Sequence, residues 1–336
     1  MIDLENTHGI KSEMQHKHDI TKLSPADLLE LSRLESIKES NRLHNKLITM
    51  DDPDSELNIY HPGFSHNLDP LYSQKSISIS FPIEKEEDDI FVLDNLFTYE
   101  ECKKLIDCAN KEGFFKVEGF VNGTRDNSRR RTRDSKMSEL VLNRIMPFIP
   151  LKTIVLDECR WDVCRFLDYW RFLKYGSKQT FRTHYDGSKK FYNDSDNRYE
   201  MSVYTLNVYL NDGFTSGGTR FYMNCKENAK VYNEEEAGEI THVVDPKKGS
   251  SLIFNHLNKG YLHDGEPLQI SEEVKEKYLM RADLIYRCRE EDLPILKRKI
   301  KEGSCRWWNS KHAEERLVED YVGNTWTCAC CNFNGY

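Results

Sequence analysis

The alternation of hydrophobic and polar residues divides the chain into a polar N-terminal arm, a β-rich centre and a mixed C-terminal tail. Residues 1–85 contain few aromatic residues and many Asp, Asn, Ser, His and Lys residues, so we expect a loosely attached arm, partly disordered or helical. Inside this arm, the helix start SPAD at 24–27 and the amphipathic run after it predict one helix to residue 47. The predicted central domain covers residues 86–288, and the tail covers 289–336.

One strand and two helices are predicted directly after the arm. The apolar run IFVLDNLF at 90–97 is typical of a short strand, and the capping-box pattern TYEE at 98–101 begins a helix to about residue 111. A second helix is predicted at 135–148, because its apolar residues recur at helical spacing and form a stripe that faces the core. The members of this stripe are Met137, Leu140, Val141, Ile145 and Met146.

An arginine-rich run, NGTRDNSRRRTRDSK at 122–136, lies between the two predicted helices. Such a run is typical either of a nucleic-acid contact or of a solvated loop with one or two inward-pointing arginines. The chain as a whole is acidic, with a net charge of −8 and a pI of about 5.8. This charge favours the solvated loop and argues against a nucleic-acid partner.

After Pro150 the pattern changes to short segments that are rich in β-branched and aromatic residues and are separated by Gly, Asn, Asp and Lys. The predicted strands are 170–175, 179–183, 201–211, 218–222, 239–244, 251–254 and 277–287. No predicted helix between them is long enough for a parallel crossover, so antiparallel pairing in a sandwich or barrel is favoured. We expect a mainly β fold, α+β overall, with the two earlier helices packed outside one sheet.

Hydropathy and cysteine content indicate the cellular environment. No apolar run approaches the length needed to span a bilayer, and the first residues lack the apolar stretch of a secretory signal. The ten cysteines are therefore expected to be reduced thiols and not a disulfide framework. A cytoplasmic or nuclear protein without membrane association is the resulting expectation.

The strongest chemical signal is His184-Tyr185-Asp186, in the stretch RFLKYGSKQTFRTHYDGS at 171–188. At the end of a β-rich segment, His184 and Asp186 point to the same side of the chain. With one distant histidine they form a 2-His-1-carboxylate triad, the ligand set that holds Fe(II) and leaves three coordination positions open. The later histidines are His242, His256, His263 and His312.

The surrounding residues distinguish these histidines. His263 follows an apolar strand approach and precedes the strong strand at 277–287, which favours it as the second imidazole ligand. His256 directly follows the apolar run at 252–254 and is expected to be a structural residue at a strand end. His242 alternates with two valines, a pattern typical of a surface position on a strand.

These motifs belong to an ordered series that resembles the iron(II)/2-oxoglutarate-dependent dioxygenases, specifically the prolyl 4-hydroxylase-like branch. The resemblance covers residues 88–288. Its elements are Tyr175-Gly176, His184-Tyr185-Asp186, VYTLNVYLND at 203–212, GGTRF at 217–221, PKKG at 246–249, SSLIFNHLNKGYLHDGEPL at 250–268 and KYLMRADLIY at 277–286. No single element is decisive, but their order and spacing make a chance agreement improbable.

The resemblance implies a double-stranded β-helix of the jelly-roll type, with His184, Asp186 and His263 as the iron ligands. It also implies Fe(II) as the metal and 2-oxoglutarate and O2 as co-substrates, and it leaves ascorbate open as an additional reductant. In the implied reaction a C–H bond is hydroxylated while 2-oxoglutarate loses CO2 and becomes succinate.

A cation is needed for the far carboxylate of 2-oxoglutarate, and two residues are candidates. Lys277 matches the family position by its Lys-Tyr context, and Arg281 lies four residues along the same strand on the same face. Arg281 is favoured modestly, because a guanidinium binds a carboxylate in a bidentate manner whereas a lysine is a point charge. Tyr175 matches a tyrosine that hydrogen-bonds the co-substrate in related proteins; a packed core tyrosine is the alternative.

Three functional classes are consistent with the sequence. The first is a hydroxylase of a protein or peptide, with proline as the expected residue. The second applies the same mechanism to a small molecule, lipid or nucleobase, and the third is a catalytically inactive jelly-roll binding module. The intact triad argues against the third class. Substrate choice depends on loops such as 120–134 and 187–200, and the sequence predicts neither the geometry of these loops nor the oligomeric state.

The tail ends in a cysteine cluster. Trp326, Cys328 and Cys331 form a Trp-x-Cys-x-x-Cys pattern that resembles the first knuckle of a zinc finger. A closed structural zinc site needs four ligands, and no second cysteine pair follows, with Cys305 the one further candidate. Cys328, Cys330 and Cys331 are therefore expected to be free or oxidisable thiols.

Overall fold

The computed structural model describes residues 62–70, 72, 74–116, 125–193, 198–225, 234–257, 261–270, 274–305, 327–328 and 333–334. The helix predicted at 24–47, His312, and Cys330 and Cys331 of the tail lie outside these residues. The chain divides into two compact units, Met1–Asp51 and Asp52–Tyr336, and every described element belongs to the second. Among the described residues, no helix is long and apolar enough to cross a membrane.

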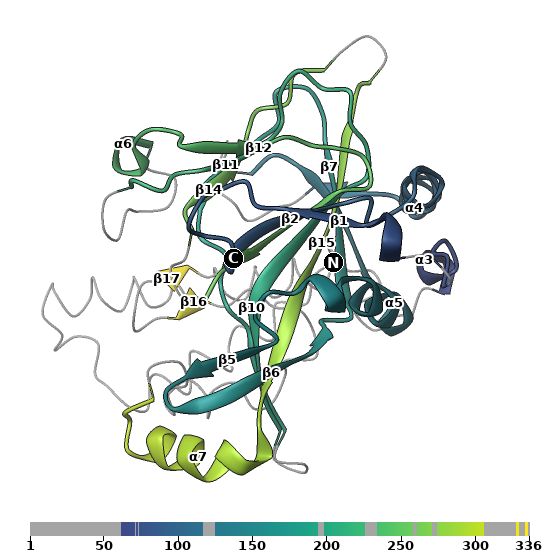
Figure 1. The fold of residues 1–336 in the computed structure, drawn as a ribbon. Helices are drawn as coiled ribbons and strands as arrows, with labels where there is room; N and C mark the ends of the chain where they lie inside the picture. The colour runs from purple at the N-terminus through teal and green to yellow at the C-terminus, as the bar shows by residue number, and fades with distance from the viewer. Residues whose placement is uncertain are drawn as a thin grey trace, which may run out of the picture. The chain divides into compact units, whose positions relative to one another are not determined.

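The described elements are mainly strands (Figure 1). The helices, including short 3₁₀ helices (η), are α3 (Pro62–Ser65), η2 (Gln74–Ser76), α4 (Tyr99–Glu112), α5 (Ser135–Ile145), η3 (Met146–Phe148), α6 (Glu234–Ala237), η5 (Glu290–Asp292) and α7 (Leu293–Lys301). The strands are β1 (Ser78–Ser80), β2 (Ile90–Asp94), β3 (Phe115–Lys116), β4 (Ser128–Arg133), β5 (Thr153–Leu156), β6 (Cys159–Phe166), β7 (Tyr169–Tyr175), β8 (Phe181–His184), β9 (Lys190–Asn193), β10 (Arg198–Tyr209), β11 (Thr219–Phe221), β12 (His242–Val244), β13 (Ser251–Asn255), β14 (His263–Gly265), β15 (Lys277–Cys288), β16 (Thr327–Cys328) and β17 (Phe333–Asn334).

Two antiparallel sheets form the body of the fold. The major sheet has the order β1-β2-β13-β10-β15-β7-β4-β3, with β6 and β9 paired to β15 and β10, and β5 paired to β6. The minor sheet has the order β12-β11-β14-β8. Each sheet joins strands that are distant in sequence, as in a double-stranded β-helix, so the predicted mainly β jelly roll is confirmed.

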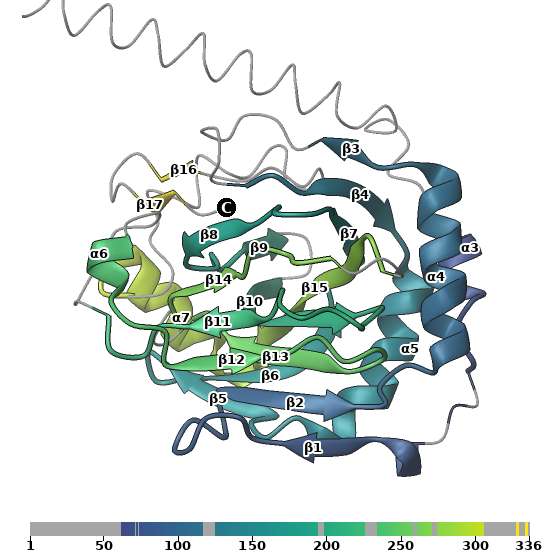
Figure 2. The ribbon, with the colours of Figure 1, turned by 90° about the horizontal axis from the view of Figure 1, so that it is seen from above.

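The helices α3, α4 and α5 gather on one side of the strands in both views (Figures 1 and 2). The predicted capping box of α4 is present: the Glu101 N–H donates to Thr98 Oγ1 over 3.1 Å, and the Thr98 N–H donates to Glu101 Oε2 over 2.8 Å. The predicted second helix ends as an α-helix at Ile145 and continues as η3, because Pro147 has no N–H for a further helical hydrogen bond.

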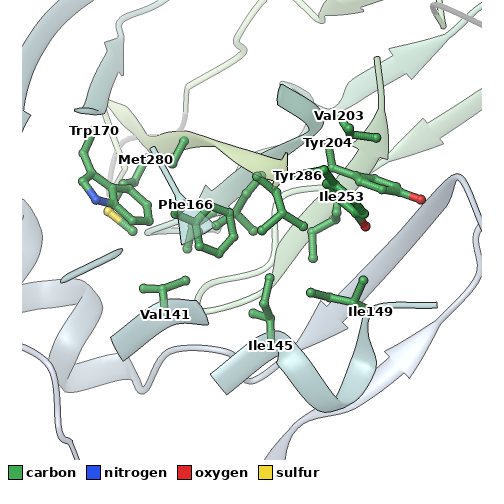
Figure 3. Packing of buried hydrophobic residues seen from close by; sticks show 14 of the residues in the cluster. Val141, Ile145, Ile149, Phe166, Trp170, Val203, Tyr204, Ile253, Met280 and Tyr286 are labelled. Atoms are coloured by element: carbon green, nitrogen blue, oxygen red, sulfur yellow. The ribbon is translucent and has the colours of Figure 1, made fainter. Parts of the chain in front are cut away.

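The apolar stripe of α5 packs against the major sheet, as predicted. Figure 3 shows Val141 and Ile145 pointing toward Phe166 and Tyr286. These side chains are essentially fully buried, and the cluster extends along α4 through Leu105. Both helices therefore cover the outer face of the major sheet and leave its other face to the minor sheet.

The part of the predicted arm that the structure describes is packed and not loosely attached. Phe64 of α3 is fully buried, and its ring lies 4.6 Å from that of Phe172 in β7. Leu68 and Ile77 are also buried in the same cluster. These few apolar residues could not be recognised as core residues from the sequence, because the segment around them is mainly polar.

The prediction of a solvated loop for the arginine-rich run is wrong, because residues 128–133 form β4. This strand pairs with β7 in register from Ser128 opposite Lys174 to Arg133 opposite Tyr169. Strands β5, β6, β9 and β14 were also not predicted. In β4 every second residue is buried, but charged side chains occupy both faces, so the alternation cannot be recognised from hydropathy.

A buried ion pair connects the helices to the loop before β1. Arg144 of α5 donates to both carboxylate oxygens of Glu101 of α4, over 2.6 and 3.0 Å, and to the carbonyls of Leu96 and Asp69. The same carboxylate completes the α4 capping box and accepts the Asp69 N–H. Removal of either partner leaves a buried charge uncompensated.

We expect Arg144→Ala to lower the free energy of unfolding by roughly 3–5 kcal/mol, because Glu101 stays buried without its counter-charge. The control is Lys104→Ala, which removes an exposed ion pair with Glu100 and should change stability by less than about 1 kcal/mol. Denaturant unfolding measures both values. Equal losses in the two variants would show that the buried pair does not stabilise the packing of α4 against α5.

Candidate metal centre

The pairing of β8 with β14 brings two of the predicted ligands together. His184 ends β8, and His263 begins β14 directly opposite it. The centroids of the two imidazole rings lie 4.2 Å apart. A β-bulge between this pair and the next, Gly265 opposite Phe181, gives β8 one extra residue, an irregularity that re-aims side chains.

Asp186 completes the cluster from the segment that follows β8. One ligand atom from each of His184, Asp186 and His263 can be chosen so that all lie within 4.8 Å of one another, and each residue is at most 4% exposed. The Nε2 atoms of His184 and His263 lie 3.8 and 3.7 Å from the two Asp186 oxygens. Among the described residues this is the one such group of three or more His, Cys, Asp or Glu side chains.

The hydrogen bonds of the two imidazoles orient them for a metal. His184 Nδ1 lies 2.8 Å from the Arg182 carbonyl, and His263 Nδ1 lies 2.8 Å from the Tyr261 carbonyl. A carbonyl only accepts, so each Nδ1 carries the proton and each Nε2 presents its lone pair to the cluster. Two neutral imidazole nitrogens and one carboxylate oxygen are the donor set of a non-haem Fe(II) site, so the residues fit this metal.

Burial sets the protonation of the cluster. Burial lowers the pKa of His184 well below its usual range, and the neighbouring His263 lowers it further; burial also lowers the pKa of His263. For Asp186, burial alone would raise the pKa, but Arg281, His263 and His184 together outweigh it and hold the pKa well below its usual range. The three side chains are therefore in their metal-binding protonation states at neutral pH.

Neighbouring side chains restrict the movement of the ligands. The Phe181 ring stacks on His184 at 3.6 Å, and the Phe254 ring meets His263 edge-on at 4.7 Å. The Thr205 hydroxyl donates to Asp186 Oδ2 over 2.7 Å and contacts His256 Nδ1 at 3.0 Å. His256 thus lies behind Asp186, at the end of β13, and is not a member of the cluster.

Arg281 lies directly on the cluster. Its Nη1 is 2.7 Å from Asp186 Oδ1, and its Nη2 donates to Thr205 Oγ1 over 3.2 Å and lies 3.6 Å from Asp283 Oδ1. The side chain is thus engaged by two carboxylates of its own chain. It contacts a candidate iron ligand, a position that the spacing along the strand does not reveal.

Lys277 is the first residue of β15, on the same face as Arg281, and it lies opposite Tyr175 of β7. Its Nζ donates to the Gly217 carbonyl and lies 5.6 and 5.4 Å from the ring centroids of Tyr175 and Tyr209. Within the described residues, no carboxylate lies within ion-pair distance of this buried ammonium. Burial lowers the pKa of Lys277 to about 8, partly offset by the charge of Glu266.

Several polar residues near the cluster were not predicted from the sequence. Asp283 accepts ion pairs from Arg171 at 2.6 Å and Lys189 at 2.9 Å, and it extends the charged network behind Arg281. The spacing Lys277-x-x-x-Arg281-x-Asp283 already placed Asp283 on the shared face of the predicted strand. The sequence spacing of Arg171 and Lys189 did not indicate that they lie near Asp283, because only strand register and loop geometry bring them there.

No family model and no curated protein matches the chain. Among solved structures, the chain is similar to the viral collagen prolyl hydroxylase of Paramecium Bursaria Chlorella virus-1 in its 2-oxoglutarate complex, with 20% identity, a TM-score of 0.37, and coverage of 59% of this chain and 95% of that one. It is also similar to a Pseudomonas putida prolyl-4-hydroxylase (14%, 0.37, 58% and 91%) and to HygX of Streptomyces hygroscopicus with nickel and 2-oxoglutarate bound (13%, 0.38, 60% and 83%). At TM-scores of this size the likeness carries no argument, and the fold assignment rests on the strand pairings themselves.

Because burial lowers the pKa of both imidazoles from its usual range, the proton should not compete with a metal near neutral pH. We expect the Co(II) affinity of the chain, followed by visible absorption, to be unchanged between about pH 7.5 and 6.5 and to fall only at lower pH. A loss of roughly threefold over this interval would mean that both imidazoles titrate at ordinary values. His263→Ala should abolish Co(II) binding, whereas His242→Ala, at a histidine outside the cluster, should leave it intact.

Proposed function

We propose that the chain is an Fe(II)- and 2-oxoglutarate-dependent oxygenase that hydroxylates a C–H bond. The observation that carries this proposal is the buried cluster of His184, Asp186 and His263, with both Nε2 lone pairs turned toward the carboxylate. When bound there, Fe(II) with 2-oxoglutarate and O2 supplies the oxidising chemistry, with succinate and CO2 as co-products. The chain supplies the ligands, their orientation and the exclusion of water.

Charge at the cluster supports an anionic co-substrate. Two neutral imidazoles and one carboxylate leave a divalent ion with one net positive charge. Arg281 adds a second positive charge next to Asp186. An anionic keto acid that binds to the metal therefore meets a positive field without needing to displace a protein ligand.

We propose Lys277, in preference to Arg281, as the partner of the far carboxylate of 2-oxoglutarate. The Arg281 guanidinium is already paired with Asp186 and Asp283, so a further carboxylate would compete with these contacts. Lys277 instead points a buried ammonium toward the rings of Tyr175 and Tyr209, without an acidic partner among the described residues. Tyr175 is proposed to donate its hydroxyl to the same carboxylate.

The substrate class follows from the resemblance and not from the cluster. A prolyl residue of a protein or peptide is the first expectation, and a small molecule is the alternative. Both use the same ligands and co-substrate. Ascorbate is proposed only as a reductant that maintains Fe(II) during assay.

Succinate release from 2-oxoglutarate tests the proposed reaction. We expect the purified chain with Fe(II) and ascorbate to release succinate, and His263→Ala to reduce the rate by at least about 100-fold, because the metal loses an essential ligand. His242→Ala is the matched control and should keep the wild-type rate. Succinate release that survives His263→Ala would refute the proposed centre.

The pH dependence of 2-oxoglutarate binding distinguishes Lys277 from Arg281. With its pKa lowered to about 8, Lys277 is protonated at pH 7 and mostly neutral at pH 9, so the affinity of the Ni(II)-loaded chain should fall about tenfold between these values. Lys277→Arg keeps the positive charge at both pH values and should remove this dependence. Calorimetric titration measures both. A wild-type affinity that does not change with pH would instead indicate Arg281.

A further inference from the structure

Strand β4, which the sequence did not predict, carries arginines on the face of the major sheet that is turned toward the metal centre. Residues that pair across strands share a face, and Arg131 pairs with Arg171 of β7, which pairs with Arg281 of β15. Arg281 contacts Asp186. An in-register row of three arginines therefore runs from the outer strands of the major sheet to a candidate iron ligand.

The same face of β4 carries Arg129, opposite Leu173, and its charge is not neutralised locally. Within the described residues, no carboxylate lies within ion-pair distance of Arg129 or Arg131. Arg131 Nη2 is buried without a hydrogen-bond partner, and so are Arg171 Nε and Arg281 Nε. Burial, followed by the charges of Arg125 and Arg131, lowers the pKa of Arg129 to about 9, so it is still protonated at neutral pH.

The nearby carboxylates are already engaged. Asp283 binds Arg171 at 2.6 Å and Lys189 at 2.9 Å, and Asp186 binds Arg281 at 2.7 Å. When Asp186 binds a divalent metal, its charge is shared with that ion. Among the described residues, the inner face of the sheet around the centre therefore keeps an excess of positive charge over its carboxylates.

A further arginine approaches from the side of the minor sheet. Arg125 forms an isolated bridge with Phe181 of β8, and its guanidinium lies 4.4 Å from the centre of that ring. The same ring stacks on the candidate ligand His184. Arg125 also contributes to the lowered pKa of Arg129, so the two sides of the positive region are electrostatically coupled.

We propose that the substrate of this oxygenase is a compact anion whose phosphate or carboxylate group binds Arg129 and Arg131 of β4 while its C–H bond faces the metal centre. This proposal rests on the proposed function, and it favours the small-molecule alternative over a neutral prolyl peptide. Arg131 and Arg281 are two strands apart, or about 10 Å between backbones, which limits the length of the bridging substrate. A planar guanidinium pair matches phosphate or carboxylate oxygens in geometry and charge.

Long polyanions fit these observations less well. The chain carries a net charge of −8, which disfavours the broad electrostatic attraction on which nucleic-acid binding depends. Arg129 and Arg131 are partly buried on the inner face of the sheet and do not form an exposed stripe. A small anion reaches such a position with less loss of hydration than a polymer.

The test uses the full chain loaded with Ni(II) and saturated with 2-oxoglutarate, so that the co-substrate position is filled. Phenyl phosphate, benzoate and benzyl alcohol are titrated calorimetrically as phosphate, carboxylate and neutral probes. We expect at least one anion to bind more tightly than the alcohol, and Arg129→Gln and Arg131→Gln each to weaken it by about tenfold. Which of the two anions binds more tightly identifies the group.

Arg130→Gln is the matched control, because Arg130 lies on the opposite face of β4, where it pairs with Glu112. Anion binding should be unchanged in this variant, and 2-oxoglutarate binding should be unchanged in all three. Equal weakening in Arg130→Gln, or anions that bind no better than the alcohol, would overturn the proposal. A single-stranded oligonucleotide that binds more tightly than phenyl phosphate and depends on Arg129 would overturn the compact substrate.

The outcomes also separate this inference from the proposed function. If the wild-type chain does not bind Ni(II) and 2-oxoglutarate, the proposed function fails whatever the anions do. If both bind but no anion does, only the inference fails. If the chain binds an anion through Arg129 but binds neither Ni(II) nor 2-oxoglutarate, the anion site exists without the proposed oxygenase.

Discussion

The alignment of His184 with His263 across β8 and β14 is the contact on which the candidate centre depends. It brings together two imidazoles that are far apart in the chain and directs both Nε2 atoms toward Asp186. Each Nδ1 is bound to a backbone carbonyl two residues earlier, so the tautomer follows from local backbone geometry. A shift of one residue in this pairing would turn one imidazole to the other face of the minor sheet.

Charge balance is the second constraint. On the inner face of the major sheet, Arg171 and Arg281 lie beside Lys189, which precedes β9. Among the described residues, these three cations pair with two carboxylates, Asp186 and Asp283. Buried charges of one sign are costly unless a counter-charge is present. The jelly roll holds this arrangement because its outer face is tightly packed against α4 and α5, with the Glu101–Arg144 ion pair between them. The outer face of the major sheet thus provides the stabilising packing, and its inner face carries the positive charge.

Two positions on one face of β15, Lys277 at its start and Arg281 four residues later, have different surroundings in the site. Lys277 lies near the Tyr175 and Tyr209 rings, and Arg281 lies at the metal ligand. Because four residues of a strand span about 13 Å, one face of this strand reaches from the proposed co-substrate position to the metal. The arginines of β4 extend the same face outward, in the direction proposed for the substrate.

The sequence by itself determined the jelly-roll class, the two covering helices and the cluster of His184, Asp186 and His263, because each depends on local periodicity or on motifs in a characteristic order. The roles of Arg281 and Lys277 could not be separated in this way, since both lie on one face of β15. Only tertiary contacts show that Arg281 pairs with carboxylates, whereas Lys277 has no carboxylate partner among the described residues. The arginine run was misread for a related reason. Its strand is recognisable only from its pairing with β7, because a charged side chain on an inner face has the same hydropathy as one in solvent.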